Sequence, residues 1–182
     1  SKKTNKKVYV PMAVDILHTG HINIINIARE LGTVIVGLLT DEAIIQYKRL
    51  PLQSFDKRKL IIENIKGVDS IVVQNSYDYS QILKELKPDF FVHGDDWKTG
   101  FQSETRNKVI NILSEWGGEL IEPKYTKNIS STLIKNKILE LSATPENRIS
   151  ILKRLIISKK IVRILESHNS LTGLIIENLK IK

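Results

Sequence analysis

Short apolar runs recur along the chain, and amphipathic stretches separate them. These runs contain few polar residues, which is typical of parallel strands that are buried on both faces. A sheet of that kind needs helices on both of its sides. The predicted strands are Val8–Val10, Val34–Leu39, Ser70–Val73, Phe90–His93 and Glu119–Glu122.

Helix signals lie between these strands. Apolar residues at helical spacing run from Ile22 to Leu31, which predicts one helix with a buried stripe. Ser54 is placed to cap a second helix, and Ser103 is placed to cap a third over residues 104–116. The alternation predicts an α/β fold, a doubly wound domain with a five-stranded parallel sheet, whose ligands sit at the carboxyl ends of the strands.

The pattern changes near residue 143. Thr144 and Pro145 stand where a helix cap and a first helical turn are expected, so this segment is typical of a linker that leads into a new helix. A strand-like run follows at 161–165. The sequence therefore predicts a domain at 1–143 and a helical C-terminal extension at 144–182. Because an extension of this length cannot form its own core, we expect it to be the start of a further domain.

Charge is distributed unevenly along the chain. The 182 residues carry a net charge of +8, but residues 1–7 contribute +4, residues 144–182 contribute +5, and residues 8–143 contribute −1. Non-specific nucleic-acid binding needs a basic face on the folded body. We therefore expect no nucleic-acid partner.

The composition also limits the compartment. The sequence has 41% apolar residues and no cysteine, so it can bury a core but cannot form disulfides or thiolate metal sites. No apolar run approaches the ~18 residues of a membrane span, and no apolar signal segment follows the basic start. A cytoplasmic protein without a membrane partner is the expectation.

Two histidines mark the most informative segment. His18 and His21 flank Gly20 directly after the first predicted strand, where the first long helix begins. Free backbone N–H groups and the positive end of the helix dipole meet there, which favours phosphate binding. The alternative interpretation is a pair of surface histidines at a helix start.

Further segments follow at the ends of the predicted strands, in the order Thr40-Asp41-Glu42, Lys48, Asp56-Lys57-Arg58-Lys59, Gly94-Asp95-Asp96-Trp97 and Ile129-Ser130-Ser131-Thr132. Together with the histidines, they resemble the HxGH nucleotidyltransferases, specifically the cytidylyltransferase branch. The resemblance covers about 8–138. It implies a Rossmann-like domain, CTP as the nucleotide, Mg²⁺ as the cofactor and a homodimer.

The resemblance also implies roles for individual residues. The expected catalytic residues are His18, His21, Lys48 and Arg58. The expected nucleotide-binding residues are Ala13, Val14, Asp15, Asp41, His93, Asp95, Ile129, Ser130, Ser131 and Thr132, with Asp15 also the expected Mg²⁺ ligand. The expected acceptor-binding residues are Asp96, Trp97, Tyr77 and Tyr79, because acidic and aromatic groups suit an ammonium group. Alternatively, Asp95 and Asp96 serve ribose or a buried network, and His93 and Trp97 belong to the core.

Two departures from the family pattern stand out. The usual Arg-Thr-Glu-Gly before the hydroxyl-rich turn is replaced by Tyr125-Thr126-Lys127-Asn128, so either Lys127 or Lys135 substitutes for the arginine or the anion is held differently. Met12 replaces the glycine that normally follows the first strand. The nucleotide is then expected to approach the backbone of Ala13 and Val14 differently.

The extension carries a second resemblance. Residues 165–175, Leu-Glu-Ser-His-Asn-Ser-Leu-Thr-Gly-Leu-Ile, look like the start of the phosphoenolpyruvate mutases, with Ser167 and Ser170 in place of an alanine and a glycine. The alternative is a generic amphipathic tail. The resemblance implies a fused mutase barrel and a phosphonate acceptor, 2-aminoethylphosphonate or its hydroxy analogue.

Several other functions stay open at this stage. Within the enzymes, a phosphocholine cytidylyltransferase and an HxGH adenylyltransferase share these motifs. A synthetase-like fragment would need a basic face and a second lysine loop, and neither is evident in 8–143. A nucleotide-binding regulatory module is the alternative that is not an enzyme.

Overall fold

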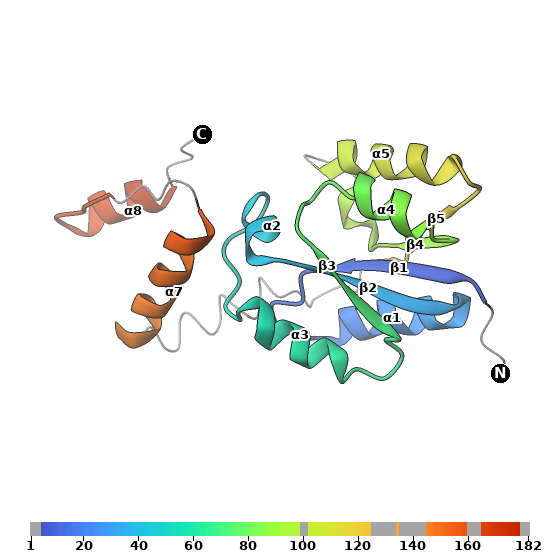
Figure 1. The fold of residues 1–182 in the computed structure, drawn as a ribbon. Coiled ribbons are helices and arrows are strands. Elements are labelled where there is room, and N and C mark those ends of the chain that lie inside the picture. Colours follow the sequence, from blue (N-terminus) through green and yellow to red (C-terminus); the bar gives the residue numbers. More distant parts are fainter. Residues whose placement is uncertain (1–4, 99–101, 125–133, 135–144, 160–164, 179–182) are drawn as a thin grey trace.

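Five parallel strands form one sheet in the order β3-β2-β1-β4-β5 (Figure 1). The computed structural model describes residues 5–98, 102–124, 134, 145–159 and 165–178. The strands are β1 (Lys7–Met12), β2 (Thr33–Leu39), β3 (Ser70–Gln74), β4 (Phe90–Val92) and β5 (Glu119–Ile121). The helices are α1 (Thr19–Leu31), α2 (Asp41–Ile45), α3 (Phe55–Glu63), α4 (Ser80–Leu86), the 3-10 turn η1 (Asp95–Trp97), α5 (Ser103–Ser114), α7 (Pro145–Ser158) and α8 (Ser170–Asn178).

This order confirms the predicted doubly wound α/β fold, because successive strands run outward from β1 on both sides. All five predicted strands are present, and no strand end differs from the prediction by more than two residues. All five strands are parallel, but the order in which they are added to the sheet reverses between β1 and β4. This reversal opens a crevice at the carboxyl edge, where ligands bind in such folds.

Each face of the sheet carries its own core. Val8, Val10 and Met12 point from β1 toward α1 and α3, where they meet Ile25 and Ile62. Figure 1 shows α1 and α3 on one side of the sheet, with α4 and α5 on the other. The alternation along β1 thus supplies both cores, as expected for a strand buried on both faces.

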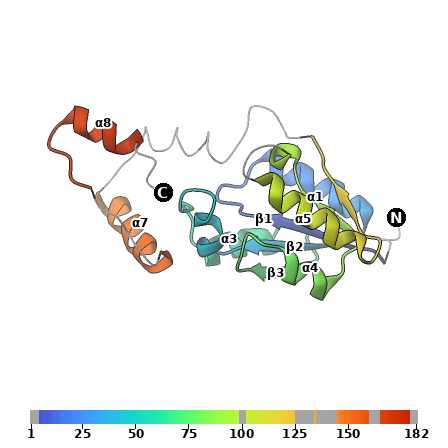
Figure 2. The ribbon, with the colours of Figure 1, turned by 90° about the horizontal axis from the view of Figure 1, so that it is seen from above.

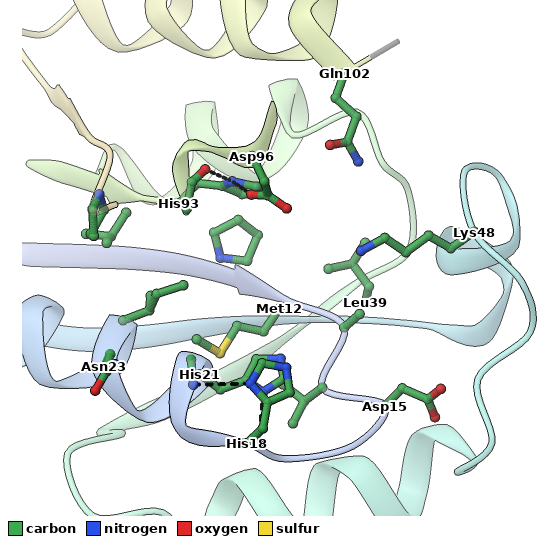
Figure 3. A pocket seen from close by; sticks show the side chains of 18 of the residues that line it. Met12, Asp15, His18, His21, Asn23, Leu39, Lys48, His93, Asp96 and Gln102 are labelled. Carbon is green, nitrogen blue, oxygen red and sulfur yellow. Dashed lines mark hydrogen bonds and ion pairs between the residues drawn. The ribbon is translucent and has the colours of Figure 1, made fainter. Parts of the chain in front are cut away.

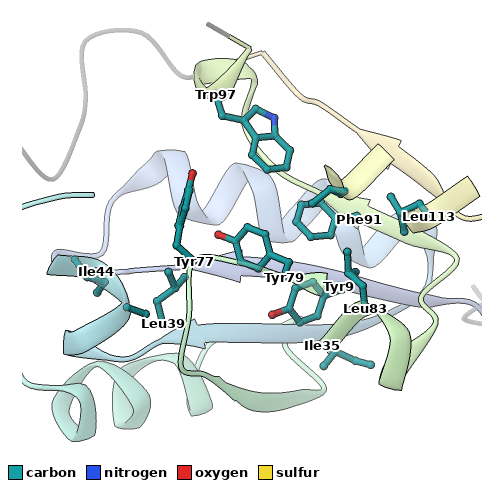
Figure 4. Packing of buried hydrophobic residues seen from close by; sticks show 12 residues of the cluster. Tyr9, Ile35, Leu39, Ile44, Tyr77, Tyr79, Leu83, Phe91, Trp97 and Leu113 are labelled. Carbon is teal, nitrogen blue, oxygen red and sulfur yellow. The ribbon is translucent and has the colours of Figure 1, made fainter. Parts of the chain in front are cut away.

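The opposite core is unusually aromatic (Figure 4). Tyr9 from β1 packs against Phe91 from β4, with ring centroids 5.6 Å apart, and its buried hydroxyl donates to Gln74 Oε1 at 2.8 Å. Gly37 on β2 leaves the space that the Tyr9 ring fills, because a Cβ there would overlap the ring. A glycine in the centre of this strand is therefore explained by packing.

Two predicted helix starts differ in detail. Ser54 occupies the cap position of α3, but its side chain makes no capping hydrogen bond. Ser103 was predicted to cap α5, but it is the first residue of that helix, and Gln102 occupies the cap position. Helix starts inferred from one residue type are uncertain by about one position for this reason.

Helices α7 and α8 lie beyond the carboxyl edge of the sheet (Figures 1 and 2). The start of α7 at Pro145 agrees with the prediction, whereas Thr144 and residues 161–164 of the strand-like run lie outside the described residues. Among the described residues, no helix is long and apolar enough to cross a membrane. Among the described residues, neither helix contributes a side chain to the two cores.

Candidate active site

A cavity of about 970 Å³ opens at the carboxyl edge of the sheet. Its walls come from the end of β1, the start of α1, the loop after α2, the loop between β3 and α4, and the end of β4. Figure 3 shows His18 and His21 on one side of it, with His93 and Asp96 on the other. The cavity is large enough for a nucleotide together with a small second substrate.

The two predicted histidines meet at the start of α1. His18 is the residue that caps the helix, and its Nδ1 accepts from the Gly20 N–H at 3.1 Å. His21 Nδ1 accepts in turn from the His18 N–H at 3.3 Å, and the ring centroids lie 3.9 Å apart. Since both Nδ1 atoms accept, the proton of each neutral ring is on Nε2.

Both histidines are neutral near pH 7. Burial lowers the pKa of His18, and burial followed by the charges of His18 and Lys48 lowers the pKa of His21 to about 3. Each ring therefore offers an Nε2–H donor without a positive charge of its own. Donors of this kind at a helix N-terminus suit the oxygens of a phosphate group.

Lys48 supplies positive charge from the opposite wall. It follows α2 and lines the cavity, and its Nζ lies 5.2 Å from the centroid of the Tyr47 ring. Figure 3 shows its side chain directed into the cavity. The charge of Lys48 contributes to the lowered pKa of both His21 and His93. It is therefore placed to act on an anion held by the histidines.

Arg58 supports the cavity wall from the side that faces away from the cavity. Its side chain is fully buried, and its Nη1 donates to the carbonyls of Ala13 at 2.6 Å and Leu39 at 2.8 Å. Its Nη2 donates to Asp41 Oδ1 at 2.8 Å. Ala13 and Leu39 line the cavity, while Arg58 does not. The structure thus places Arg58 behind residues that line the cavity, and its expected catalytic role stays a prediction.

The segment after β1 is held in an uncommon conformation. Val14 lines the cavity with a φ of +48°, which is rare for a β-branched residue and costs of order 1–3 kcal/mol. Arg58 holds the preceding carbonyl, that of Ala13. Met12, the departure from the family glycine, is a lining residue here. Ala13, Val14 and Asp15 all line the cavity, and their expected contacts with the nucleotide stay predictions.

The far wall combines an acid with aromatic rings. His93 Nδ1 lies 2.8 Å from the Gly94 carbonyl and therefore donates to it, while burial lowers the pKa of His93. Neutral His93 thus keeps Nε2 as an acceptor. Asp96 lines the cavity 3.8 Å from His93 Nδ1, and Tyr77 and Tyr79 lie on the same wall. All four were predicted as ligand-binding residues.

With this geometry in place, comparisons with known proteins decide the family. Residues 13–137 match the cytidylyltransferase-like family model. The chain is also 33% identical over 138 residues to the glycerol-3-phosphate cytidylyltransferase of Bacillus subtilis (strain 168), covering 75% of this chain and 99% of that protein. This chain belongs to the cytidylyltransferase-like family. It is a CTP-dependent nucleotidyltransferase.

One further relative and one solved structure are similar to this cytidylyltransferase. The ethanolamine-phosphate cytidylyltransferase of Dictyostelium discoideum is 32% identical over 144 residues, which cover 76% of this chain and 39% of that protein. A solved lipopolysaccharide core biosynthesis protein from Thermoplasma volcanium GSS1 superposes with a TM-score of 0.56 at 22% identity, over 68% of this chain and 98% of that chain. The structural likeness confirms the fold.

Three of the residues expected to bind ligands do not line the cavity among the described residues, so their expected contacts stay predictions. Trp97 is fully buried and does not line the cavity: its indole N–H donates to Glu122 at 2.8 Å, and its ring stacks on His93 at 4.0 Å. Asp41 binds two arginines and is also absent from the lining, as is Asp95.

The hydroxyl-rich turn belongs to a segment that the structure does not describe. Ile129, Ser130, Ser131 and Thr132 lie outside the described residues, as do Lys127 and Lys135. Their roles in the cytidylyltransferase stay predictions.

Other residues that line or support the cavity were not predicted. Tyr47 and Gln102 line the cavity, and the Tyr47 ring lies 4.3 Å from that of Tyr77. Arg154 of α7 binds Asp41 at 2.8 Å. A tyrosine beside Lys48 is a signal that was present in the sequence, whereas nothing in the sequence around Arg154 indicates its distant partner.

Proposed function

We propose that the chain transfers CMP from CTP to 2-aminoethylphosphonate, with release of pyrophosphate, in phosphonate biosynthesis. The observation that carries this proposal is the polarity of the cavity. Two neutral donors at the start of α1 face phosphate on one side, and an acid with aromatic rings lies on the other. A substrate with an anionic end and an ammonium end matches both walls.

The far wall favours an ammonium group. Carboxylates and aromatic faces both attract a cation, and Asp96 and Tyr77 supply one of each. Among the described residues, the buried Tyr77 hydroxyl has no hydrogen-bond partner, as expected of a group that awaits a ligand. His93 Nε2 adds an acceptor for an N–H donor. Glycerol 3-phosphate has hydroxyl groups where these substrates have an ammonium group, so it would bind less favourably to this wall.

Transfer requires one bond to form and one to break. A phosphonate oxygen attacks the α-phosphorus of CTP in line, the bond to the bridging oxygen breaks, and pyrophosphate leaves with the electron pair. The nucleophile is already an anion, so positioning and charge stabilisation supply the catalysis. His18 and His21 donate from Nε2 to phosphate oxygens, and Lys48 neutralises the pyrophosphate as it departs.

Mg²⁺ is part of this proposal. Among the described residues, no group of three or more His, Cys, Asp or Glu side chains is arranged to hold a metal ion. Mg²⁺ usually binds to one or two carboxylates together with substrate phosphates, and Asp15 brings a carboxylate to the cavity wall. The residues therefore fit an ion that arrives with the nucleotide. When bound, Mg²⁺ withdraws charge from the phosphate oxygens.

The choice of a phosphonate rests on the extension. Residues 165–175 resemble the start of the phosphoenolpyruvate mutases, which form carbon–phosphorus bonds, and a fused barrel would place such an enzyme next to this one. A homodimer is likewise proposed from the family resemblance. Phosphoethanolamine is the second candidate, because it carries the same ammonium group and a relative is named for it.

Pyrophosphate release in the presence of Mg²⁺ tests the proposal. CTP and ATP are each crossed with 2-aminoethylphosphonate, 2-hydroxyethylphosphonate, phosphoethanolamine, phosphocholine and glycerol 3-phosphate, and the His21→Ala variant controls for contaminating enzymes. Preferred turnover of CTP with 2-aminoethylphosphonate is expected. Turnover of CTP with phosphate esters alone would overturn the phosphonate assignment, and turnover with ATP alone would overturn the choice of nucleotide.

Asp96→Asn probes the ammonium contact. Because Asp96 is partly exposed, we expect the KM for 2-aminoethylphosphonate to rise about tenfold while the KM for CTP stays within about twofold. Steady-state kinetics measure both constants, and Asp56→Asn on the exposed surface of α3 is the matched control. The KM for 2-hydroxyethylphosphonate, which has a hydroxyl group in place of the ammonium group, should not change in Asp96→Asn. An unchanged KM for the amino substrate would remove Asp96 from the acceptor site.

A further inference from the structure

Arg154 links α7 to a segment about a hundred residues earlier in the chain. Its Nη1 donates to the Leu52 carbonyl at 2.6 Å, and its Nη2 donates to Asp41 Oδ2 at 2.8 Å and to the Gln53 carbonyl at 2.9 Å. Figures 1 and 2 show α7 beside α2, and the two helices are in contact. The residue lies beyond the 13–137 span that matches the family.

Arg154 and Arg58 share two acceptors. Arg58 Nη2 donates to Asp41 Oδ1, while Arg154 takes the other oxygen of the same carboxylate. The Gln53 carbonyl likewise accepts from Arg58 Nε at 3.3 Å and from Arg154. The side chains of Arg154 and Asp41 are 19% and 13% exposed, so this contact is largely shielded from water. Charged hydrogen bonds in such surroundings are stronger than those at the surface.

The residues around the shared acceptors contact the cavity lining directly. The Gln53 N–H donates to Asp15 Oδ1 at 3.1 Å, and Arg58 holds the carbonyls of Ala13 and Leu39. Asp15, Ala13 and Leu39 line the cavity. A change in the position of Gln53 or Arg58 is therefore a change in the wall that faces the nucleotide.

The same contacts bracket the segment that carries Lys48, which consists of α2 and the loop after it. Asp41 is the first residue of α2 and Gln53 lies near the end of the loop, and Arg154 binds both. Lys48 itself lies between them, with an exposed side chain directed into the cavity. Fixing both ends of a loop reduces the conformations that its middle can adopt.

We propose that Arg154 is a positioning residue for nucleotide transfer, which ties the C-terminal extension to the Lys48 loop and to the cavity wall. It acts through Asp41 and Gln53, and it contacts no substrate. The inference rests on CTP-dependent transfer and does not depend on which acceptor the enzyme uses. The extension thereby becomes part of the working active site.

Arg154→Gln tests this role. CTP binding is measured by calorimetry without an acceptor, and steady-state kinetics follow with the best acceptor. We expect the Kd and the KM for CTP to rise about 2- to 30-fold, the range found for residues that act on a site through their neighbours. The KM for the acceptor should stay unchanged. Arg148→Gln, which removes the same charge from an exposed position of α7, should leave both constants unaltered.

Two measurements separate positioning from a loss of stability. A variant that is only less stable has fewer active molecules, so its apparent kcat falls while its KM and Kd for CTP stay constant. Arg154→Lys keeps the charge without the fork of donors and should lie between wild type and Arg154→Gln. Wild-type constants for CTP in Arg154→Gln would overturn the inference. Failure of the wild-type chain itself to bind CTP would overturn the assigned activity instead.

In a double variant, Arg154→Gln should add little to Asp41→Asn, because both changes break the same contact. Fully multiplicative effects of the two substitutions on the Kd for CTP would contradict the proposed route through Asp41.

Discussion

His18 and His21 are held by each other as much as by the fold. The backbone N–H of His18 fixes the tautomer of His21, and the Gly20 N–H fixes that of His18. The two rings thus behave as parts of one helix cap, similar to the reciprocal cap that serine and glutamate form elsewhere. Rigid donors need no reorganisation when charge develops on a phosphate, and this is how the two rings would contribute to the proposed transfer.

Removal of either ring should therefore reduce turnover strongly. We expect His18→Ala and His21→Ala each to lower kcat by about 10²–10³-fold, because each deletes one donor to the phosphates. His168→Ala, at an exposed position of the extension, is the control. Circular dichroism checks that the fold is retained. A kcat within about tenfold of wild type would remove that histidine from the mechanism.

The buried histidines should also make stability depend on pH. An unfolded histidine titrates near pH 6.5, whereas the pKa of His21 in the folded chain is about 3. Between these values the unfolded chain binds more protons, so the stability that is present above pH 6.5 is lost as the pH falls. From pH 7 to pH 5 we expect His21 to account for a loss of about 2 kcal/mol.

Urea unfolding at pH 7 and pH 5 measures this loss. His21→Gln keeps an acceptor at the same position of the helix cap but does not titrate. It should therefore lose less stability than wild type over this interval. Equal losses in the two proteins would show that His21 is not the titrating group.

At the scale of the elements, the strands could be predicted closely, whereas the contacts behind the cavity lining could not. Val8 and Val34 begin apolar runs whose burial on both faces is a local property of the sequence. The role of Arg58 depends on carbonyls at the ends of two strands, and the burial of Trp97 depends on Glu122. Such partners are set by the tertiary fold, so motif order locates a functional region but not each contact.

Gly37 provides a test of strand packing. A Cβ at this position would overlap the Tyr9 ring, whose hydroxyl is bonded to Gln74. We expect Gly37→Ala to reduce the free energy of unfolding by about 1–3 kcal/mol, the usual cost of overfilling a core. Urea unfolding measures the change.

Gly173→Ala is the matched control, because only the Ser167 hydroxyl, at 3.6 Å, would come near the added Cβ in α8. It should leave the chain as stable or slightly more stable, since alanine favours helices by up to about 1 kcal/mol over glycine. Equal stability of Gly37→Ala and wild type would contradict the packing described for the aromatic core.

At the scale of the whole molecule, the hydrophobic cores and most of the net positive charge lie in different parts of the chain. The two cores draw their buried residues from the segment between Val8 and Leu113. Helices α7 and α8 instead expose large apolar side chains: Ile149, Leu152, Ile156, Ile157, Leu171 and Leu174. Much of the positive charge also lies in the extension. The sheet domain thus supplies the stability, and the extension contributes through particular contacts.

Hydrogen exchange should reveal this division. Amides of β1 and β2 are expected to exchange at least about 100-fold more slowly than those of α8, because strands in a core open only with global unfolding. Mass spectrometry of peptide fragments measures the rates. Addition of CTP should slow exchange in α7 but not in α8, since Arg154 lies on α7. Equal protection of β1 and α8 would mean that the extension belongs to the same cooperative unit.

The position of Arg154 in the chain has a consequence for biosynthesis. The last described strand ends at Ile121, so all five strands have been synthesised before Arg154 leaves the ribosome. Because N-terminal segments fold first during translation, Asp41 then has Arg58 as its arginine partner, and its second arginine arrives later. On the role proposed for Arg154, a chain truncated before this residue should fold its sheet but bind CTP more weakly than the full chain.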